Sequence, residues 1–228
     1  MTLQAGTTAA PGRLKAARVF EREFAEAEDL ADLSYAARRV LATSAALFFV
    51  NGAAATSIRE ITGACGLTPG ALYKHFASKD ELLNVLVQHG HQALELRIGR
   101  ARAEADPGTV PQIAAFVHAY VMGHLVNPEL AQVVRREYLH LSPDRYRETV
   151  RRRRRLRQQL TDLLRAGAQA GELDLLGGPE GATRVAVMTL DMCSRTSEWY
   201  DPRRSEPPEQ VADRYVQAAL RLAGAPGR

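Results

Sequence analysis

The 228-residue sequence predicts an all-α protein, with an N-terminal three-helix domain followed by a larger helical bundle. Apolar residues recur every three or four positions through most of the chain, which is the period of an amphipathic helix. Groups rich in glycine and proline, such as "NPE", "SPD", "LGGPEG" and "DPRRSEPPE", separate these stretches. The sequence shows neither the alternating pattern of a strand nor a repeat of fixed period.

Composition places the chain among ordinary globular proteins. Hydrophobic residues make up 46% and charged residues 25%, so there is enough material for a buried core. No apolar run approaches the roughly 18 residues of a membrane span, and the start lacks the apolar core of a secretory signal. We therefore expect a cytoplasmic protein without membrane contact. Cys65 and Cys193 lie in helical patterns and are expected to be reduced core residues. The net charge of +4 is compatible with an acidic partner.

The first part of the chain, residues 1–33, is an N-terminal extension. Residues 1–12 are small and polar and contain Pro11 and Gly12, so we expect disorder there. Residues 13–32 have a helical pattern. Its apolar stripe comprises Leu14, Ala17, Phe20, Phe24, Ala27 and Leu30.

The following domain, residues 34–85, begins with a helix at about 34–50 that ends at Asn51-Gly52. Residues 86–228 form the second domain. A long helix is expected to open after Ser78 and to run to about residue 105. Further helices are expected at about 109–126, 128–141, 145–170, 180–199 and 208–223.

The stretch "TSIREITGACGLTPGALYKHFASKDELL", residues 56–83, interrupts its helical pattern at short intervals. Ser57 with Glu60 forms a capping box, in which each side chain satisfies a backbone N–H at the start of a helix. Gly66 suits the left-handed conformation that ends this helix. Thr68 caps the next helix, and Pro69 suits its first position, where the missing N–H has no cost. Ser78 with Glu81 forms a second capping box and opens the third helix.

The helix over 69–76 is too short to be stable alone in water, so neighbouring residues must hold it. Ile58, Ile61, Leu67, Leu72 and Phe76 are spaced to pack against the helix at 34–50. The remaining residues face outward and are first small, then aromatic and basic: Thr68, Gly70, Ala71, Tyr73, Lys74 and His75. Small residues allow close approach to a surface, and the others reach phosphates and base edges. The pattern predicts a helix-turn-helix whose second helix enters the major groove of DNA.

Over residues 34–85 the sequence resembles the DNA-binding domain of the TetR family of transcriptional regulators, most specifically in "GLTPGALYKHFASKDELL". Thr62 and Cys65 depart from the family's usual alanine. The resemblance implies binding to double-stranded DNA. Ser57 and Arg59 would contact phosphate, with a base as a further contact, and Lys79 would bind a phosphate. It places Thr68, Pro69, Gly70 and Ala71 closest to the bases, and Tyr73, Lys74 and His75 on phosphates or a base edge. An alternative for His75 is a capping or packing role.

The resemblance also implies that residues 86–228 bind a small effector and form a homodimer, which would read a palindromic operator. Two stripes offer a dimer seam: Val211, Tyr215, Ala218 and Leu222, and Val185, Thr189 and Met192.

The run of five arginines at 151–155 circles its helix completely, so one or two must point inward. Arg152 and Arg153 share a face with the Leu156 and Leu160 stripe. Either acids such as Glu129 or Glu137 neutralise them, or an anionic ligand does, or the helix end projects into solvent. A fourth alternative, DNA binding by this run, is less favoured because the run lies far from the helix-turn-helix in sequence.

The segments "RRLRQQLTDLLRAGAQAGEL" and "SRTSEWYDPRR" resemble TetR-like regulators that respond to acyl-CoA thioesters. This second resemblance implies an acyl-CoA effector, because guanidinium groups suit its phosphates and an apolar interior suits its acyl chain. The implied effector-binding residues are Arg152, Arg153, Arg157 and Trp199, and Trp199 alternatively packs at the dimer seam.

Two other functions remain open from the sequence: an architectural DNA-binding protein without an effector, and a helical-bundle enzyme. The enzyme alternative finds no support in the residues, since no catalytic motif, cofactor motif or metal-ligand spacing is present. We therefore expect a repressor, not an enzyme, that an effector releases from its operator, with no cofactor and no metal.

Overall fold

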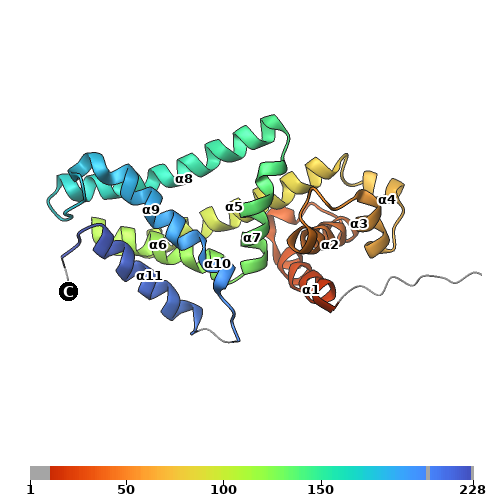
Figure 1. Ribbon diagram of the computed structural model, residues 1–228, viewed down its shortest axis with the longest axis horizontal. Helices are drawn as coiled ribbons and strands as arrows, with labels where there is room; N and C mark the ends of the chain where they lie inside the picture. The colour runs from red at the N-terminus through yellow and green to blue at the C-terminus, as the bar shows by residue number, and fades with distance from the viewer. Residues whose placement is uncertain (1–10, 204–205, 227–228) are drawn as a thin grey trace, which may run out of the picture. The chain divides into compact units, whose positions relative to one another are not determined.

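The computed structural model describes residues 11–203 and 206–226, with side chains from residue 18 onward. Every regular element in these residues is helical, as Figure 1 shows. The α-helices are α1 (Pro11–Glu26), α2 (Tyr35–Asn51), α3 (Ile58–Cys65), α4 (Pro69–Tyr73), α5 (Lys79–Glu104), α6 (Thr109–Leu125), α7 (Pro128–Glu137), α8 (Pro143–Gln169), α9 (Ala182–Ser194), α10 (Thr196–Trp199) and α11 (Pro208–Leu222). Three 3-10 turns accompany them: η1 (Glu28–Leu30), η2 (Tyr138–His140) and η3 (Gly178–Gly181).

The predicted all-α class is confirmed, with four adjustments to single elements. The helix α1 already begins at Pro11, inside the segment expected to be disordered; residues 1–10 lie outside the described part of the chain. The helix α4 ends at Tyr73, three residues early. The stretch 128–141 divides into α7 and η2, and the stretch 180–199 divides into α9 and α10.

The chain forms two compact units. The first contains the described residues up to His89 together with Val133–Tyr146, and the second contains Gly90–Gln132 and the described residues from Arg147 onward. The division falls within α5, between His89 and Gly90, and the sequence did not indicate that Val133–Tyr146 joins the first unit.

In the first unit, the N-terminal extension packs against α2. Phe20 and Phe24 of α1 are fully buried and stack with their ring centroids 5.8 Å apart. Arg38 of α2 donates hydrogen bonds to the carbonyls of Leu33, Ala25 and Ala31 at 3.0–3.4 Å. The extension is therefore an integral part of this unit.

A buried histidine joins the extension to α5. His89 Nδ1 lies 2.8 and 2.9 Å from the two carboxylate oxygens of Asp29. The imidazole also meets the ring of Phe24 edge-on, with the ring centroids 5.2 Å apart. This polar contact is shielded by aromatic carbon, which strengthens it relative to the same contact in water.

The second unit is built around α6, which contacts α9, α10 and α11, as Figure 1 shows. The predicted stripe on α8 is buried in the same core through Leu156, Leu160 and Leu164. Cys193 is buried and free, like Cys65 in the first unit, as predicted. Burial raises the pKa of the Cys193 thiol to about 12. No helix among the described residues is long and apolar enough to cross a membrane.

Candidate nucleic-acid interface and effector cleft

The interrupted stretch forms α3, a tight turn and α4, and most of its predicted caps are present. The Ser57 hydroxyl accepts from the Glu60 N–H at 3.2 Å, while the Glu60 carboxylate accepts from the Ser57 N–H at 2.7 Å. Gly66 ends α3 in the left-handed region at φ 67° and ψ 30°, which an L side chain rarely adopts. The Thr68 hydroxyl accepts from the Ala71 N–H at 3.3 Å, and Pro69 is the first residue of α4.

The second predicted capping box differs in one bond. The Ser78 hydroxyl accepts from the Glu81 N–H at 3.0 Å, as expected. The Glu81 carboxylate, however, accepts from the N–H of Ala77 at 2.6 Å, one residue before the predicted donor. The side chain of Glu81 thus reaches past the cap residue Ser78 and holds the segment that follows α4.

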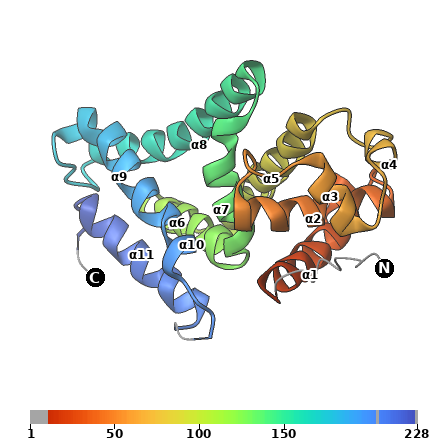
Figure 2. The ribbon, with the colours of Figure 1, turned by 45° about the vertical axis from the view of Figure 1, so that its right-hand side comes forward.

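Beneath α3 and α4 lies an apolar support. Ile61, Leu72 and Phe76 are fully buried, and Ile58 and Leu67 are half-buried. Figure 2 shows α3 and α4 side by side beside α2. A five-residue helix is held in place by this packing, because so few residues do not return the cost of helix nucleation.

The predicted DNA-contacting side chains lie mostly on the surface of these two helices. The exposed ones are Ser57, Arg59, Thr68, Pro69, Gly70, Tyr73, Lys74 and His75, while Ala71 and Lys79 are half-buried. The hydroxyls of Ser57 and Thr68 act as caps, and the Ser57 hydroxyl also donates to the Glu60 carboxylate at 2.9 Å, so neither hydroxyl is a free side-chain group.

Lys79 has a structural role that the sequence did not reveal. Its ammonium donates to the carbonyls of Ala53 at 2.8 Å and Thr56 at 2.9 Å. Two of its three N–H donors therefore fix the loop that leads into α3. The predicted phosphate contact must use the third donor.

The same loop is fixed from the other side by the segment 133–146. Glu137, a buried carboxylate, accepts from the Ala53 N–H at 2.7 Å. At the start of α5, Asp80 accepts from the N–H and the hydroxyl of Ser142 at 2.7 and 2.9 Å and pairs with Arg145 at 2.9 Å. These contacts hold the α7–α8 connection to the helix-turn-helix unit.

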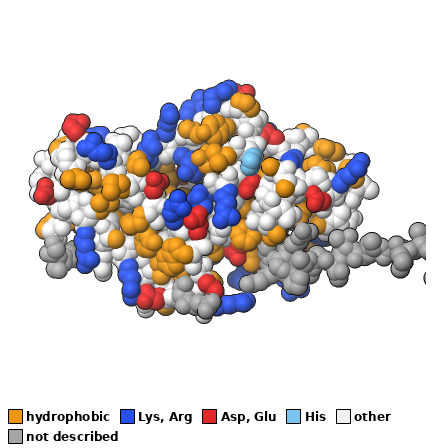
Figure 3. Space-filling model, in the orientation of Figure 1, with side chains coloured by type: hydrophobic (Ala, Val, Ile, Leu, Met, Phe, Trp, Pro, Cys, Tyr) orange, Lys and Arg blue, Asp and Glu red, His pale blue; other side chains and the backbone are white. Residues whose placement is uncertain are grey.

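In the second unit, the arginine run divides as helical geometry requires. Arg151, Arg154 and Arg155 are exposed, whereas Arg152 and Arg153 are half-buried. Figure 3 shows Lys and Arg side chains along the edge of the molecule that α8 forms in Figure 1. The predicted inward pair is thus on the side of the helix that also buries the leucine stripe.

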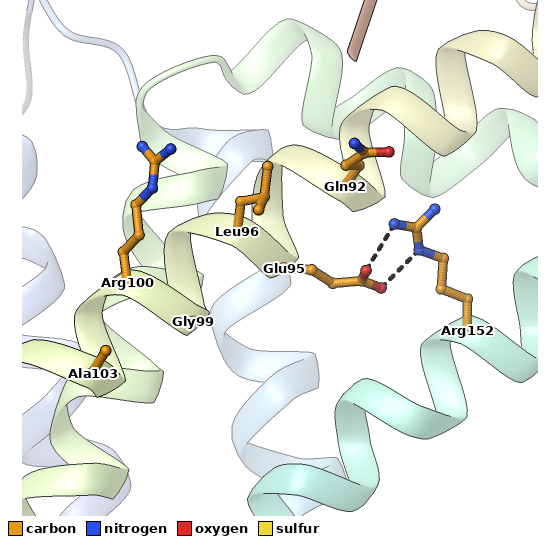
Figure 4. Close-up of a pocket in the computed structure, with 7 residues that line it drawn as sticks. All are labelled: Gln92, Glu95, Leu96, Gly99, Arg100, Ala103 and Arg152. Atoms are coloured by element: carbon orange, nitrogen blue, oxygen red, sulfur yellow. Dashed lines mark hydrogen bonds and ion pairs between the residues drawn. The ribbon is translucent and has the colours of Figure 1, made fainter. Parts of the chain in front are cut away.

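A cleft of about 530 Å³ lies between α5 and α8, as Figure 4 shows. Arg152 is 16% exposed and forms a bidentate ion pair with Glu95, with both N···O distances 2.7 Å. The acid in this ion pair is Glu95, which the sequence did not indicate. The cleft is lined by Gln92, Glu95, Leu96, Gly99, Arg100, Ala103 and Arg152.

A second buried polar group, which the sequence did not indicate, lies on the same helix as Glu95. His91, one helical turn before Glu95 on α5, is 6% exposed, and its Nε2 atom has no hydrogen-bond partner among the described residues. Burial, and then the positive charges of Arg153 and Arg152, lower the pKa of His91 from 6.5 to about 3. On α6, the ring of His124 packs at a tilt of 33° against Tyr120, with the ring centroids 4.6 Å apart, and its charge also opposes protonation of His91.

Three of the four predicted effector residues, Arg153, Arg157 and Trp199, are not among the residues that line the cleft. Arg157 is half-buried one turn beyond Arg153. Trp199 is 50% exposed and stacks on Tyr215 of α11, with the ring centroids 6.5 Å apart. Trp199 thus packs on α11 of its own chain and does not line the cleft.

The chain matches two protein families over separate segments. Residues 40–86 match the bacterial regulatory proteins of the tetR family, and residues 107–223, half of the chain, match the tetracyclin repressor-like C-terminal domain. The chain belongs to the TetR family. TetR-family proteins are DNA-binding transcriptional regulators, so the enzyme alternative is wrong.

Curated relatives of this TetR-family chain match only around the helix-turn-helix. An uncharacterised regulator, YerO of Bacillus subtilis, is 51% identical over 45 residues, which is 20% of this chain and 16% of the relative. The repressor KstR2 of Mycobacterium tuberculosis is 41% identical over 49 residues, or 22% of this chain and 24% of the relative. The match spans a quarter or less of these relatives' length.

Solved structures match over most of the chain. A TetR-family protein from Rhodococcus RHA1 has a TM-score of 0.77 at 29% identity and covers 85% of this chain and 100% of its own. KstR2 of M. tuberculosis, described as a ketosteroid transcriptional regulator, has a TM-score of 0.72 at 24% identity, covering 84% and 95%. AibR, solved with isovaleryl coenzyme A and operator DNA, has a TM-score of 0.71 at 21% identity, covering 83% and 99%. The latter two similarities show the fold alone.

Proposed function

We propose that this TetR-family regulator is a homodimeric repressor that binds a palindromic operator through α3 and α4. An amphipathic anion, with an acyl-CoA as the candidate, binds the cleft between α5 and α8 and releases the operator. The observation that carries the proposal is the pairing of guanidinium groups with an apolar floor in one cleft. The proposal places the protein in the cytoplasm, where its operator DNA lies.

The DNA-binding part of the proposal follows from the exposed surface of α3 and α4. Gly70 has no side chain at the exposed start of α4, which allows the backbone to approach base edges. Tyr73 and Lys74 are exposed on the next turn, where they reach phosphates. One helix this short contacts few base pairs, so useful specificity requires two half-sites read by a dimer.

The effector part follows from the chemistry of the cleft. Its volume of about 530 Å³ lies within the range of small-molecule sites. Leu96, Gly99 and Ala103 supply apolar surface, while Arg100 and Arg152 supply guanidinium groups that suit phosphate or carboxylate. AibR, which shares the fold, binds isovaleryl coenzyme A, and this supports a CoA thioester as the candidate.

We propose a dimer seam that keeps only part of the two stripes suggested by the sequence. Val211, Val185 and Thr189 are already buried within the single chain, so they are not available to a second copy. The apolar surface that remains exposed on these helices includes Met188 and the Trp199 ring stacked on Tyr215. We assign the seam to this α9–α11 surface.

The test measures operator binding and release with purified protein. An operator selected from random DNA is titrated with octanoyl-CoA, CoA and octanoate, using the parent, Arg152→Ala/Arg153→Ala and the control Arg154→Ala/Arg155→Ala. The control makes the same charge change on the exposed side of α8. Octanoyl-CoA should release the parent and the control but not the inward double variant.

Two results would contradict this proposal. If no CoA thioester dissociates the parent complex, the effector class is wrong. If the two double variants respond equally, the inward arginines do not hold the effector. Binding that is equally tight to all DNA sequences would instead favour an architectural protein.

A further inference from the structure

The ion pair between Arg152 and Glu95 occupies the side of the cleft where an anionic effector would bind. The guanidinium uses two N–H groups on the two carboxylate oxygens, each at 2.7 Å, as Figure 4 shows. This fork geometry is the one that arginine also offers to a ligand carboxylate or phosphate. The cation that best suits the effector is therefore already paired within the chain.

The second observation is the unpartnered Nε2 of His91, on the same helix one turn before Glu95. A buried imidazole nitrogen without a partner is destabilising, and it marks a position where a ligand or water completes the hydrogen bonding. Among the charges that act on it, those of Arg153 and Arg152 lower the pKa of His91 most. Glu95 and His91 are four residues apart and so share a face of α5. Both observations thus concern the surroundings of Arg152, although His91 is not among the residues that line the cleft.

We propose that Glu95 occupies the effector's anion position in the free protein, and that an effector oxyanion displaces it from Arg152 and accepts a hydrogen bond from His91 Nε2–H. This inference rests on the proposed function, which it makes more specific. Glu95 is 35% exposed, so the displaced carboxylate turns into water at little cost. The effector must then carry a carboxylate or a phosphate that matches the bidentate geometry.

A consequence for specificity follows. A neutral amphiphile of the same size gains the apolar surface of Leu96 and Ala103 but has no group to exchange for Glu95. An oxyanion replaces one bidentate pair with another and also satisfies His91. The Glu95 carboxylate thus competes with the ligand for Arg152 and lowers the affinity of weak or neutral ligands.

The experiment removes the competitor without removing the site. In the full-length protein, Glu95→Gln removes the carboxylate that pairs with Arg152, and Glu104→Gln is the control because it makes the same charge change at the exposed end of α5. Inorganic pyrophosphate and octanoate are the probes, and they distinguish a phosphate from a carboxylate as the preferred group. Binding of both probes is followed by calorimetry, and binding of pyrophosphate is also followed by ³¹P line broadening.

We expect Glu95→Gln to bind at least one probe about tenfold more tightly than the parent, with Glu104→Gln unchanged. Adding His91→Phe to Glu95→Gln should reverse part of this gain; if the double variant does not fold, the Glu95 comparison decides alone. Equal affinities of the Glu95 and Glu104 variants would overturn the inference. These probes need no operator, so this outcome is separate from a failure of octanoyl-CoA to release DNA.

Discussion

Removal of the Lys79 ammonium should destabilise the protein as well as weaken DNA binding. Lys79→Met keeps the aliphatic stem but deletes the donors to the Ala53 and Thr56 carbonyls, at 2.8 and 2.9 Å. A hydrogen bond from a charged donor contributes about 1.5–3 kcal/mol when buried. Because Lys79 is half-buried, we expect about 1 kcal/mol for each bond, or about 2 kcal/mol of the free energy of unfolding in total.

The assay compares Lys79→Met with Lys74→Met, which removes an exposed ammonium from the residue that directly follows α4. For a chain of this size about 2 kcal/mol corresponds to a melting temperature lower by roughly 4–8 °C. Melting must be measured at one protein concentration, because dimerisation would shift the midpoint. Lys74→Met should melt like the parent.

DNA binding gives a second readout that tests the sequence-based role of Lys79. A lost phosphate contact lowers the slope of log affinity against log salt by about 1, and we expect this for Lys74→Met. If Lys79 acts only by fixing the loop before α3, Lys79→Met weakens binding at an unchanged slope. A Lys79→Met protein as stable as Lys74→Met would refute the structural reasoning.

Three further predictions concern buried groups. Glu137→Gln replaces the charged acceptor of the Ala53 N–H, and we expect a loss of about 1–2 kcal/mol in urea unfolding; no loss would show that this bond is unimportant. His91 is neutral in the folded protein because its pKa is lowered to about 3. Below about pH 6.5 the unfolded chain therefore binds more protons than the folded one, so the free energy of unfolding falls as pH falls. Between pH 6 and pH 4 we expect a fall of up to about 1.4 kcal/mol per pH unit. His91→Gln should flatten this dependence, and an unchanged slope would contradict the assignment. Cys65 and Cys193 should resist a thiol reagent at pH 8 in the native protein and react after unfolding, and rapid native labelling would argue against their burial.

The sequence predicted the helices well because its signals there are local. Caps such as Ser57 and Thr68 act within three residues, and the left-handed turn at Gly66 needs only glycine. The error at α4, which ends at Tyr73, also has a local reason. The Glu81 carboxylate binds the Ala77 N–H and so stabilises a turn where the periodic pattern continued the helix.

The candidate site was predicted only in part. Helical periodicity correctly turned Arg152 and Arg153 toward the core side of α8, since the direction of a side chain follows from its position in a helix. Periodicity carries no information on the partner, and Glu95 is 57 residues away in the chain. His91 was passed over for a different reason. A single histidine in a helical pattern gives no sign that its Nε2 lacks a partner, which only the packed structure shows.

The contacts that place Val133–Tyr146 in the first unit differ in how far the sequence could predict them. Asp80 lies in the first turn of α5, where the helix dipole already favours an acid, so its bonds to Ser142 and Arg145 gave no signal. Glu137 is different, because it is the last residue of α7, where the dipole disfavours a carboxylate. An acid at that position needs a tertiary donor to offset the repulsion, and the Ala53 N–H, 84 residues away, supplies it. Charges that oppose the local helix dipole are therefore a better guide to distant contacts in this fold than charges that agree with it.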